Sequence, residues 1–102
     1  MEFRKIMYKT DNQEYAQINN MLGDGRVALL CNDDVSRIGL LRGTMRRRKW
    51  VELGDIVLVN LREFEPIKCD IIHKYVNYES MYLKEISELS ENIIVTYENN
   101  IL

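Results

Sequence analysis

The chain is poor in the residues that build metal sites and disulfide frameworks. Its 102 residues include two cysteines, one histidine and one proline. Cys31 and Cys69 lie far apart and neither belongs to a Cys-x-x-Cys pair, so a four-ligand zinc site with His73 would need carboxylates. Both cysteines lie in strand-like apolar runs, where a free cysteine usually behaves as a small buried hydrophobe. We therefore expect two buried thiols, no metal and no cofactor, with a disulfide as the disfavoured alternative.

Long apolar runs are also missing. No run approaches the roughly 20 residues that a membrane-spanning helix needs. Residues 1–6 lack the apolar segment and cleavage site of a signal peptide. With 46% hydrophobic and 29% charged residues, the composition is that of an ordinary globular protein. We expect a cytoplasmic monomer that forms a single domain over residues 1–102 and has no membrane partner.

No catalytic arrangement is visible. His73 alternates with apolar residues in a strand-like run, which is typical of a structural histidine. The glycines at Gly23-Asp24-Gly25 are followed by neither the lysine and hydroxyl residue of a P-loop nor the third glycine of a dinucleotide fingerprint. The carboxylates are scattered, with no pair suited to acid and base roles. The sequence therefore predicts a binding protein and not an enzyme.

What the chain does contain is a dense group of cations in a weakly acidic protein. The formal net charge is −2, yet residues 42–50 hold five cationic side chains and the only tryptophan: Arg42, Arg46, Arg47, Arg48, Lys49 and Trp50. Arginine pairs with phosphate oxygens and stacks on bases, and an indole offers a flat face to a base. The run predicts RNA binding, with a solvated basic turn as the alternative. Trp50 has a competing role as a core anchor, because a lone tryptophan can bury a large area.

Charge is also divided along the chain. Residues 26–50 carry seven cations against two anions, a balance of +5, whereas residues 76–102 carry one lysine against five glutamates, a balance of −4. This asymmetry predicts one face for an anionic partner and another that repels it. Arg26 and Arg37 lie in the basic half and would extend the patch.

Five segments have the composition of short β-strands: Tyr15–Leu22, Arg26–Cys31, Val35–Arg42, Ile56–Leu61 and Lys68–Tyr75. Gly23 and Gly25 permit the positive φ of a tight hairpin between the first two. Gly39, inside the third, is typical of a bulge or a sharp bend. Short strands at near-regular spacing predict a small closed barrel over about residues 13–76.

The period becomes helical over about residues 77–90. Four apolar side chains recur at spacings of four, four and three, on one helical face: Tyr78, Tyr82, Ile86 and Leu89. Asn77 is the expected N-cap, with Glu79 in the first turn. We expect the stripe to pack on the barrel as a lid, and residues 1–12 and 96–102 to be flexible ends. The predicted fold class is mainly β, a five-stranded barrel with a C-terminal α-helix packed on it.

Several segments match, in order, the motifs of one known family. Asp11–Ile18 is similar to its first strand, D-G-Q-E-Y-A-Q-V, and Met21–Arg26 to its hairpin, M-L-G-N-G-R. Arg42–Val51 is similar to its segment R-G-K-L-R-K-K-V-W-I, while Gly54–Val59 and Lys68–Ile72 match two further strands. With these motifs, the chain resembles translation initiation factor 1A of eukaryotes and archaea from about residue 11 to residue 89.

The resemblance implies an OB fold of the S1 and initiation factor 1 type in a non-enzymatic initiation factor. Family members sit near the decoding A site of the small ribosomal subunit, where they help to recruit initiator tRNA and support start-codon selection. The resemblance implies contacts to ribosomal RNA from the basic run and its neighbours: Arg42, Arg46, Arg47, Arg48 and Trp50, with Arg26 and Arg37 as helpers. Lys49 falls where the family often has valine, and Thr44 replaces a lysine, which removes one phosphate contact.

The resemblance also implies a form without tails. Eukaryotic members carry a long basic N-terminal tail and a long acidic C-terminal tail, and neither is expected here. The family's C-terminal tip docks on the subunit-joining GTPase, initiation factor 5B, and Ile101 and Leu102 would keep a small part of that contact. Two alternatives stay open: an OB protein that binds or chaperones RNA away from ribosomes, and a protein-interaction paralogue of the factor.

Overall fold

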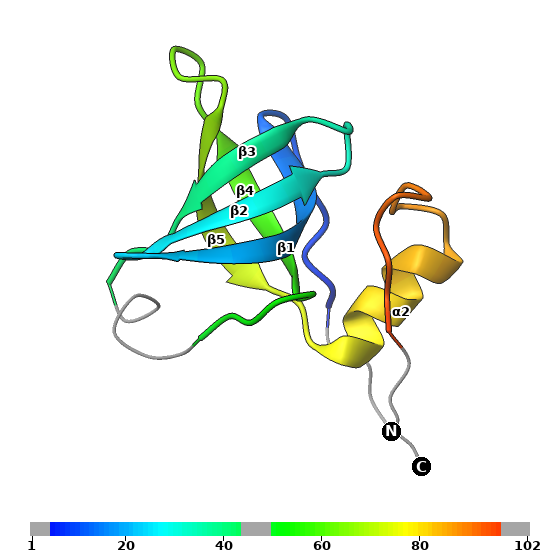
Figure 1. Cartoon of the computed structure of the whole chain (residues 1–102). Helices are drawn as coiled ribbons and strands as arrows, with labels where there is room; N and C mark the ends of the chain where they lie inside the picture. Colours follow the sequence, from blue (N-terminus) through cyan, green and yellow to red (C-terminus); the bar gives the residue numbers. More distant parts are fainter. Residues whose placement is uncertain (1–4, 44–49, 97–102) are drawn as a thin grey trace.

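The computed structural model describes residues 5–43 and 50–96. In this part of the chain five β-strands close into a barrel and one α-helix follows (Figure 1). The elements are β1 (Gln13–Gly23), β2 (Arg26–Cys31), β3 (Ser36–Leu40), β4 (Ile56–Leu61), β5 (Lys68–Lys74) and α2 (Asn77–Glu85). The predicted fold class, a five-stranded β-barrel with a C-terminal helix, is confirmed. No described helix is long and apolar enough to cross a membrane.

The barrel closes in the strand order β1-β2-β3-β5-β4. All neighbouring strands are antiparallel except β3 and β5, which pair in parallel over three residues. Strand β1 reaches both sides of the closure: Gln13–Gln17 pair with β4, and Ala16–Gly23 pair with β2. A register shift between Ile18 and Asn20 accompanies this change of partner. Such a bulge bends a strand, which a small barrel needs in order to close.

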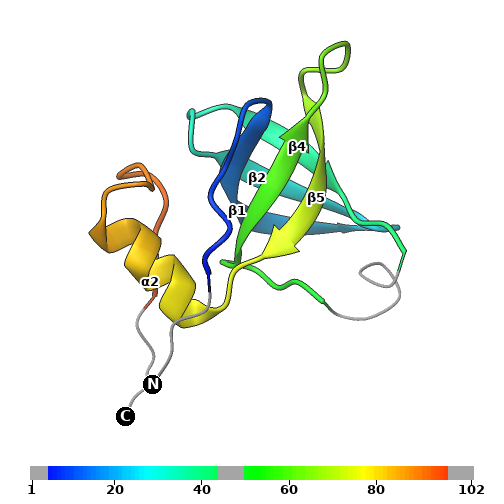
Figure 2. The ribbon, with the colours of Figure 1, turned by 180° about the vertical axis from the view of Figure 1, so that it is seen from behind.

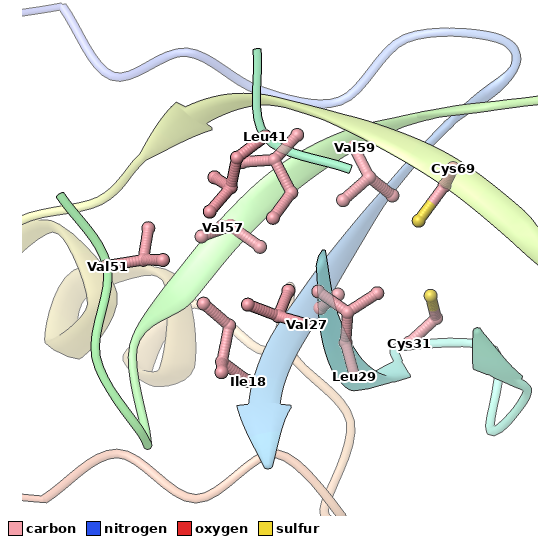
Figure 3. Close-up of a cluster of buried hydrophobic side chains, with 11 residues drawn as sticks. Ile18, Val27, Leu29, Cys31, Leu41, Val51, Val57, Val59 and Cys69 are labelled. Carbon is pink, nitrogen blue, oxygen red and sulfur yellow. The ribbon is translucent and has the colours of Figure 1, made fainter. Parts of the chain in front are cut away.

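Alternation along the strands fills the barrel interior. In β2, Val27, Leu29 and Cys31 are fully buried at every second position. Figure 3 shows their side chains directed toward residues of the opposite strands, among them Val57 and Cys69. Cys31 and Cys69 are both buried and carry free thiols, as the sequence predicted.

Gly39 is explained by close packing and not by a bulge. The register of β3 with β2 and β5 is regular on both sides of Gly39. A Cβ atom at this position would lie 3.1 Å from Ile71 Cδ1 and 3.1 Å from Leu29 Cδ2. Of the two features predicted here, a bulge or a sharp bend, the bulge is wrong. The glycine lets two core side chains approach the backbone.

Helix α2 buries a different face from the one that the sequence predicted. Its buried residues are Glu79, Ser80 and Leu83. Tyr78 is 50% exposed, Tyr82 42% and Ile86 42%, so the prediction that they form a lid is wrong. Leu89, the fourth residue of the stripe, is buried against the barrel as predicted. The predicted stripe assumed a helix that continues to residue 90, but the helix ends at Glu85 and Ser87 adopts a φ of 64°. The chain then turns back, and this returning segment selects the face that packs.

The N-cap differs by one residue from the prediction. Val76, and not Asn77, is the cap residue, and its backbone N–H donates to Glu79 Oε1 at 3.0 Å. Glu79 satisfies a free amide at the helix start and places a negative charge at the positive end of the helix dipole. Its burial is thus explained by a capping hydrogen bond.

The returning segment, residues 86–96, connects α2 to the barrel (Figure 2). A second apolar cluster joins residues of the barrel wall, the helix and this segment: Tyr15, Ile56, Leu58, Tyr75, Leu83, Leu89 and Ile93. A hydrogen bond also ties the returning segment to β1: the backbone N–H of Ile94 donates to the side-chain oxygen Oε1 of Gln17 at 3.0 Å. Of the ends expected to be flexible, residues 1–4 and 97–102 lie outside the described residues.

Candidate nucleic-acid interface

Only part of the predicted RNA-binding set falls within the described residues. Arg46, Arg47, Arg48 and Lys49 lie outside them, as do Ile101 and Leu102, and their roles stay predictions. The structure places the remaining four predicted residues: Arg26, Arg37, Arg42 and Trp50. Gly43 and Trp50 flank the undescribed part of the basic run, so the geometry around them defines where that run joins the barrel.

Arg26 and Arg42 lie at one end of the barrel. Arg26 opens β2 and is paired in register with Leu40 at the end of β3. The chain then continues along the same edge, since Leu41 N–H donates to the carbonyl of Gly25 at 2.7 Å. Arg26 is exposed, and the side chain of Arg42 is 72% exposed. Both guanidinium groups therefore reach solvent next to the basic run, as a phosphate-binding patch requires.

Asp70, which the sequence analysis did not single out, holds Arg42 at this edge. Arg42 Nε lies 3.4 Å from Asp70 Oδ1. The same carboxylate accepts two hydrogen bonds from Arg62, at 3.0 Å from Nε and 2.9 Å from Nη2. The hydrogen bonds from Arg62, with Arg42 nearby, hold the pKa of Asp70 below its usual value. Asp70 is the acidic residue of the Lys68–Ile72 motif, and this motif is the sequence feature from which its role could have been predicted.

Arg37 is already engaged within the protein. Its Nη1 and Nη2 lie 3.0 Å from the two carboxylate oxygens of Asp33, and its Nε donates to the carbonyl of Pro66 at 3.0 Å. The side chain is only 10% exposed. Burial alone would raise the pKa of Asp33, but the hydrogen bonds from Arg37 lower it overall. Arg37 thus ties the turn after β2 to the loop before β5, and a phosphate contact would have to compete with these bonds.

Trp50 packs against the core of the barrel. It is partly buried and contacts the interior cluster that includes Val51 and Leu41. Its carbonyl accepts a hydrogen bond of 3.0 Å from Lys74 Nζ, which also lies 3.2 Å from Asp55 Oδ2. This geometry supports the core-anchor role that the sequence left open, while base stacking stays a prediction. Lys74 fixes the end of the basic run, and the sequence pattern gave no sign of it.

Comparison with known proteins identifies the family. The family described as Translation initiation factor 1A / IF-1 matches residues 3–96. The chain belongs to this family. It is 43% identical over 90 residues to Eukaryotic translation initiation factor 1A of Triticum aestivum, covering 88% of this chain and 62% of that protein. It is 44% identical over 88 residues to Eukaryotic translation initiation factor 1A of Schizosaccharomyces pombe, and the match covers 86% of this chain and 64% of that protein.

The initiation factor 1A relatives include archaeal proteins as well. Translation initiation factor 1A of Sulfurisphaera tokodaii is 40% identical over 91 residues, which is 89% of this chain and 84% of the relative. The chain therefore spans less than two thirds of the length of the eukaryotic relatives above and most of the archaeal one. The range matched by the family contains the whole barrel, α2 and the returning segment. The family resemblance predicted from the motifs is thereby confirmed.

Proposed function

We propose that this protein is a translation initiation factor that binds the small ribosomal subunit near the decoding A site through ribosomal RNA. In this role it promotes initiator tRNA recruitment and start-codon selection. The observation that carries the proposal is the family match over residues 3–96, together with relatives from eukaryotes and an archaeon that are named translation initiation factor 1A. The exposed Arg26 and Arg42, at the barrel end where the basic run begins, support an RNA-facing edge.

The proposed mechanism is positioning and not chemical transformation. Guanidinium groups from Arg26, Arg42, Arg46, Arg47 and Arg48 would pair with phosphate oxygens, with Lys49 as a weaker contributor. The barrel supplies a rigid base for these contacts, because its interior is closely packed. Bound in this way, the protein acts as a non-enzymatic factor in the cytoplasm. We further propose that it acts as a monomer, and that Ile101 and Leu102 keep a small contact with initiation factor 5B.

The acidic side of the molecule supports a single binding orientation. Glu85 and Glu91 are exposed on α2 and the returning segment. Lys84, the only cation of residues 76–96, directs its ammonium group to the carbonyls of Ser90 and Ile93. This side would be repelled by RNA phosphates, whereas the Arg26 edge would be attracted. The charge distribution thus favours an approach with the basic edge toward ribosomal RNA.

Sedimentation with purified small ribosomal subunits tests the proposal. The wild-type protein is compared with Arg46→Ala/Arg47→Ala and with a control, Lys5→Ala/Lys9→Ala, which removes the same charge from the N-terminal segment. We expect the wild type and the control to pellet with subunits, and the arginine variant to remain in the supernatant with unchanged thermal stability. Equal loss in both variants would indicate binding through bulk charge.

Sedimentation with subunits, together with a titration of free single-stranded RNA, distinguishes the two alternative functions. If no variant pellets with subunits but the protein binds free single-stranded RNA through the arginines, it is an RNA-binding or RNA-chaperone protein that works away from ribosomes. If it binds neither subunits nor RNA, the ribosomal proposal is overturned and the protein-interaction paralogue remains.

A further inference from the structure

A groove lined by tyrosines lies between the N-terminal segment and α2. It has a volume of about 870 Å³, with Tyr8 on one side and Tyr78, Met81 and Tyr82 on the other. Within the described part of the chain, Lys5 and Glu85 supply the charged groups of its lining. The three tyrosines are 45%, 50% and 42% exposed for Tyr8, Tyr78 and Tyr82. This volume lies within the range of pockets that bind a drug-sized ligand, so the groove has room for one or two side chains of a partner.

The tyrosines are not required for the packing of the helix. Leu83 supplies the α2 contact to the second apolar cluster, and neither Tyr78 nor Tyr82 belongs to that cluster. Both side chains line the groove and are about half exposed to solvent. Exposed aromatic side chains gathered in one place are typical of binding surfaces, because tyrosine buries a large area with few rotamers to fix.

The charges around the groove indicate the chemistry of its partner. Glu85 lines the groove and is exposed. The pKa of the Tyr8 phenol is raised, mainly by burial and then by Tyr82. The charge of Glu88 adds a smaller effect in the same direction, so this carboxylate also lies near Tyr8. Lys84 is directed away, to the carbonyls of the returning segment. Among the described residues of the lining, Lys5 is the one cation. Phosphate groups are therefore disfavoured here, while a cationic side chain would be attracted by the carboxylates and by the tyrosine ring faces.

We propose that this groove binds a segment of a partner protein that carries a large apolar side chain next to an arginine or lysine. The apolar side chain lies against Tyr78 and Tyr82, which are one helical turn apart, and the cation pairs with Glu85. Figures 1 and 2 show α2 on one side of the barrel and the chain that leaves β3 on the other. The groove and the basic edge can thus be occupied at the same time, and this inference does not depend on the RNA interface.

An NMR titration of the isotope-labelled full chain tests the inference with three short synthetic peptides. The first carries a leucine and a tryptophan flanked by arginines, the second has the same apolar residues flanked by glutamates, and the third has the arginines but serines as apolar replacements. We expect the first peptide to shift the amide signals of Tyr8, Tyr78 and Tyr82. The other two should bind at least about tenfold more weakly, a difference of about 1.4 kcal/mol.

Variants show whether the groove is responsible. Tyr78→Ser/Tyr82→Ser should lower the affinity for the first peptide by about tenfold or more. Glu85→Arg should weaken the arginine peptide and strengthen the glutamate peptide, a reversal that loss of folding cannot produce. Phe64→Ser is the matched control, because Phe64 is 89% exposed in the loop between β4 and β5. It should bind the first peptide as the wild type does.

Four results would overturn the inference. They are an absence of shifts with the first peptide, equal binding of all three peptides, an equal loss of affinity in Phe64→Ser, and stronger shifts of the groove tyrosines with a single-stranded RNA than with the peptide. A fifth result that would overturn it is a movement of the groove signals in Phe3→Ser or Leu102→Ser without any peptide. In that case the groove would hold an end of this chain and not a partner.

Discussion

The Tyr15 hydroxyl donates a hydrogen bond of 2.9 Å to Glu88 Oε1 and so joins strand β1 to the segment that follows α2. The same hydroxyl oxygen accepts the backbone N–H of Lys9 at 3.1 Å. Burial, reinforced by the nearby Glu88 carboxylate, raises the pKa of Tyr15 to about 12. The phenol thus stays protonated at neutral pH and joins the N-terminal segment and strand β1 to the returning segment, which lies 73 residues further along the chain.

Replacing Tyr15 with phenylalanine should loosen the returning segment. Tyr15→Phe keeps the ring but removes the donor to Glu88 and the acceptor for Lys9, which we expect to lower the free energy of unfolding by about 2 kcal/mol. Urea denaturation measures the loss, and hydrogen exchange should be faster in residues 86–95. Tyr78→Phe, at an exposed tyrosine, is the control and should change stability little. Equal stability of both variants would mean that the Tyr15–Glu88 bond contributes nothing.

Trp50 should contribute to folding even where RNA is absent. Because it packs against the barrel core, Trp50→Ala is expected to lower the free energy of unfolding by about 2 kcal/mol, less than for a fully buried tryptophan. Trp50→Phe should recover most of this stability. Urea denaturation and RNA titration of both variants separate the two roles. Wild-type stability with weakened RNA binding would support stacking on a base instead.

Arg26 and Arg37 should respond differently to salt. If about five cations contact irregular RNA, log K should fall by roughly 3.5 units for each tenfold rise in salt, at about 0.7 per contact. Arg26→Ala should reduce this slope by about 0.7 and leave stability unchanged, because the side chain is exposed. Arg37→Ala should mainly lower the melting temperature, since it breaks the bonds to Asp33 and Pro66. Titrations at several salt concentrations would contradict this contrast if both variants changed the slope equally.

The ion pair of Asp70 with Arg62 should make stability depend on pH in the acid range. The pKa of Asp70 is lowered in the folded protein, so the unfolded chain binds its proton more tightly. Its stabilising contribution is complete above the unfolded pKa, near 4, and is lost as the pH falls through the lower folded value. Asp70→Asn should therefore reduce stability at neutral pH and flatten the decline below about pH 5. Chemical denaturation across this range checks the effect, with Asp11→Asn as the control. Parallel curves for wild type and Asp70→Asn would contradict it.

Gly39 should tolerate no side chain without a cost. Gly39→Ala places a Cβ against Leu29 and Ile71, and we expect a loss of about 1 kcal/mol. Gly39→Val should cost about 3 kcal/mol, because two further methyl groups enter the filled interior. Thermal unfolding orders the two variants. A stabilised Gly39→Ala would show that the neighbouring side chains move aside easily.

The sequence by itself determined the barrel and its family. Alternating apolar residues, as in Val27, Leu29 and Cys31, fix which face of a strand is buried, because successive side chains point to opposite sides. Glycines at positive φ, such as Gly23 and Gly25, fix the hairpin between β1 and β2. These rules are local, and the family motifs lie within the same segments.

Only the tertiary structure decided which apolar and charged side chains remain available for binding. The helical stripe predicted that Tyr78 and Tyr82 would pack inward, but the return of the chain at Ser87 left them exposed and buried Leu83 instead. Arg37 and Arg42 look alike in the sequence, yet Arg37 donates to the carbonyl of Pro66, 29 residues away, and is 10% exposed, whereas Arg42 reaches solvent beside Asp70. A side chain's availability depends on partners that folding brings from distant segments, and no local pattern records where those partners will lie.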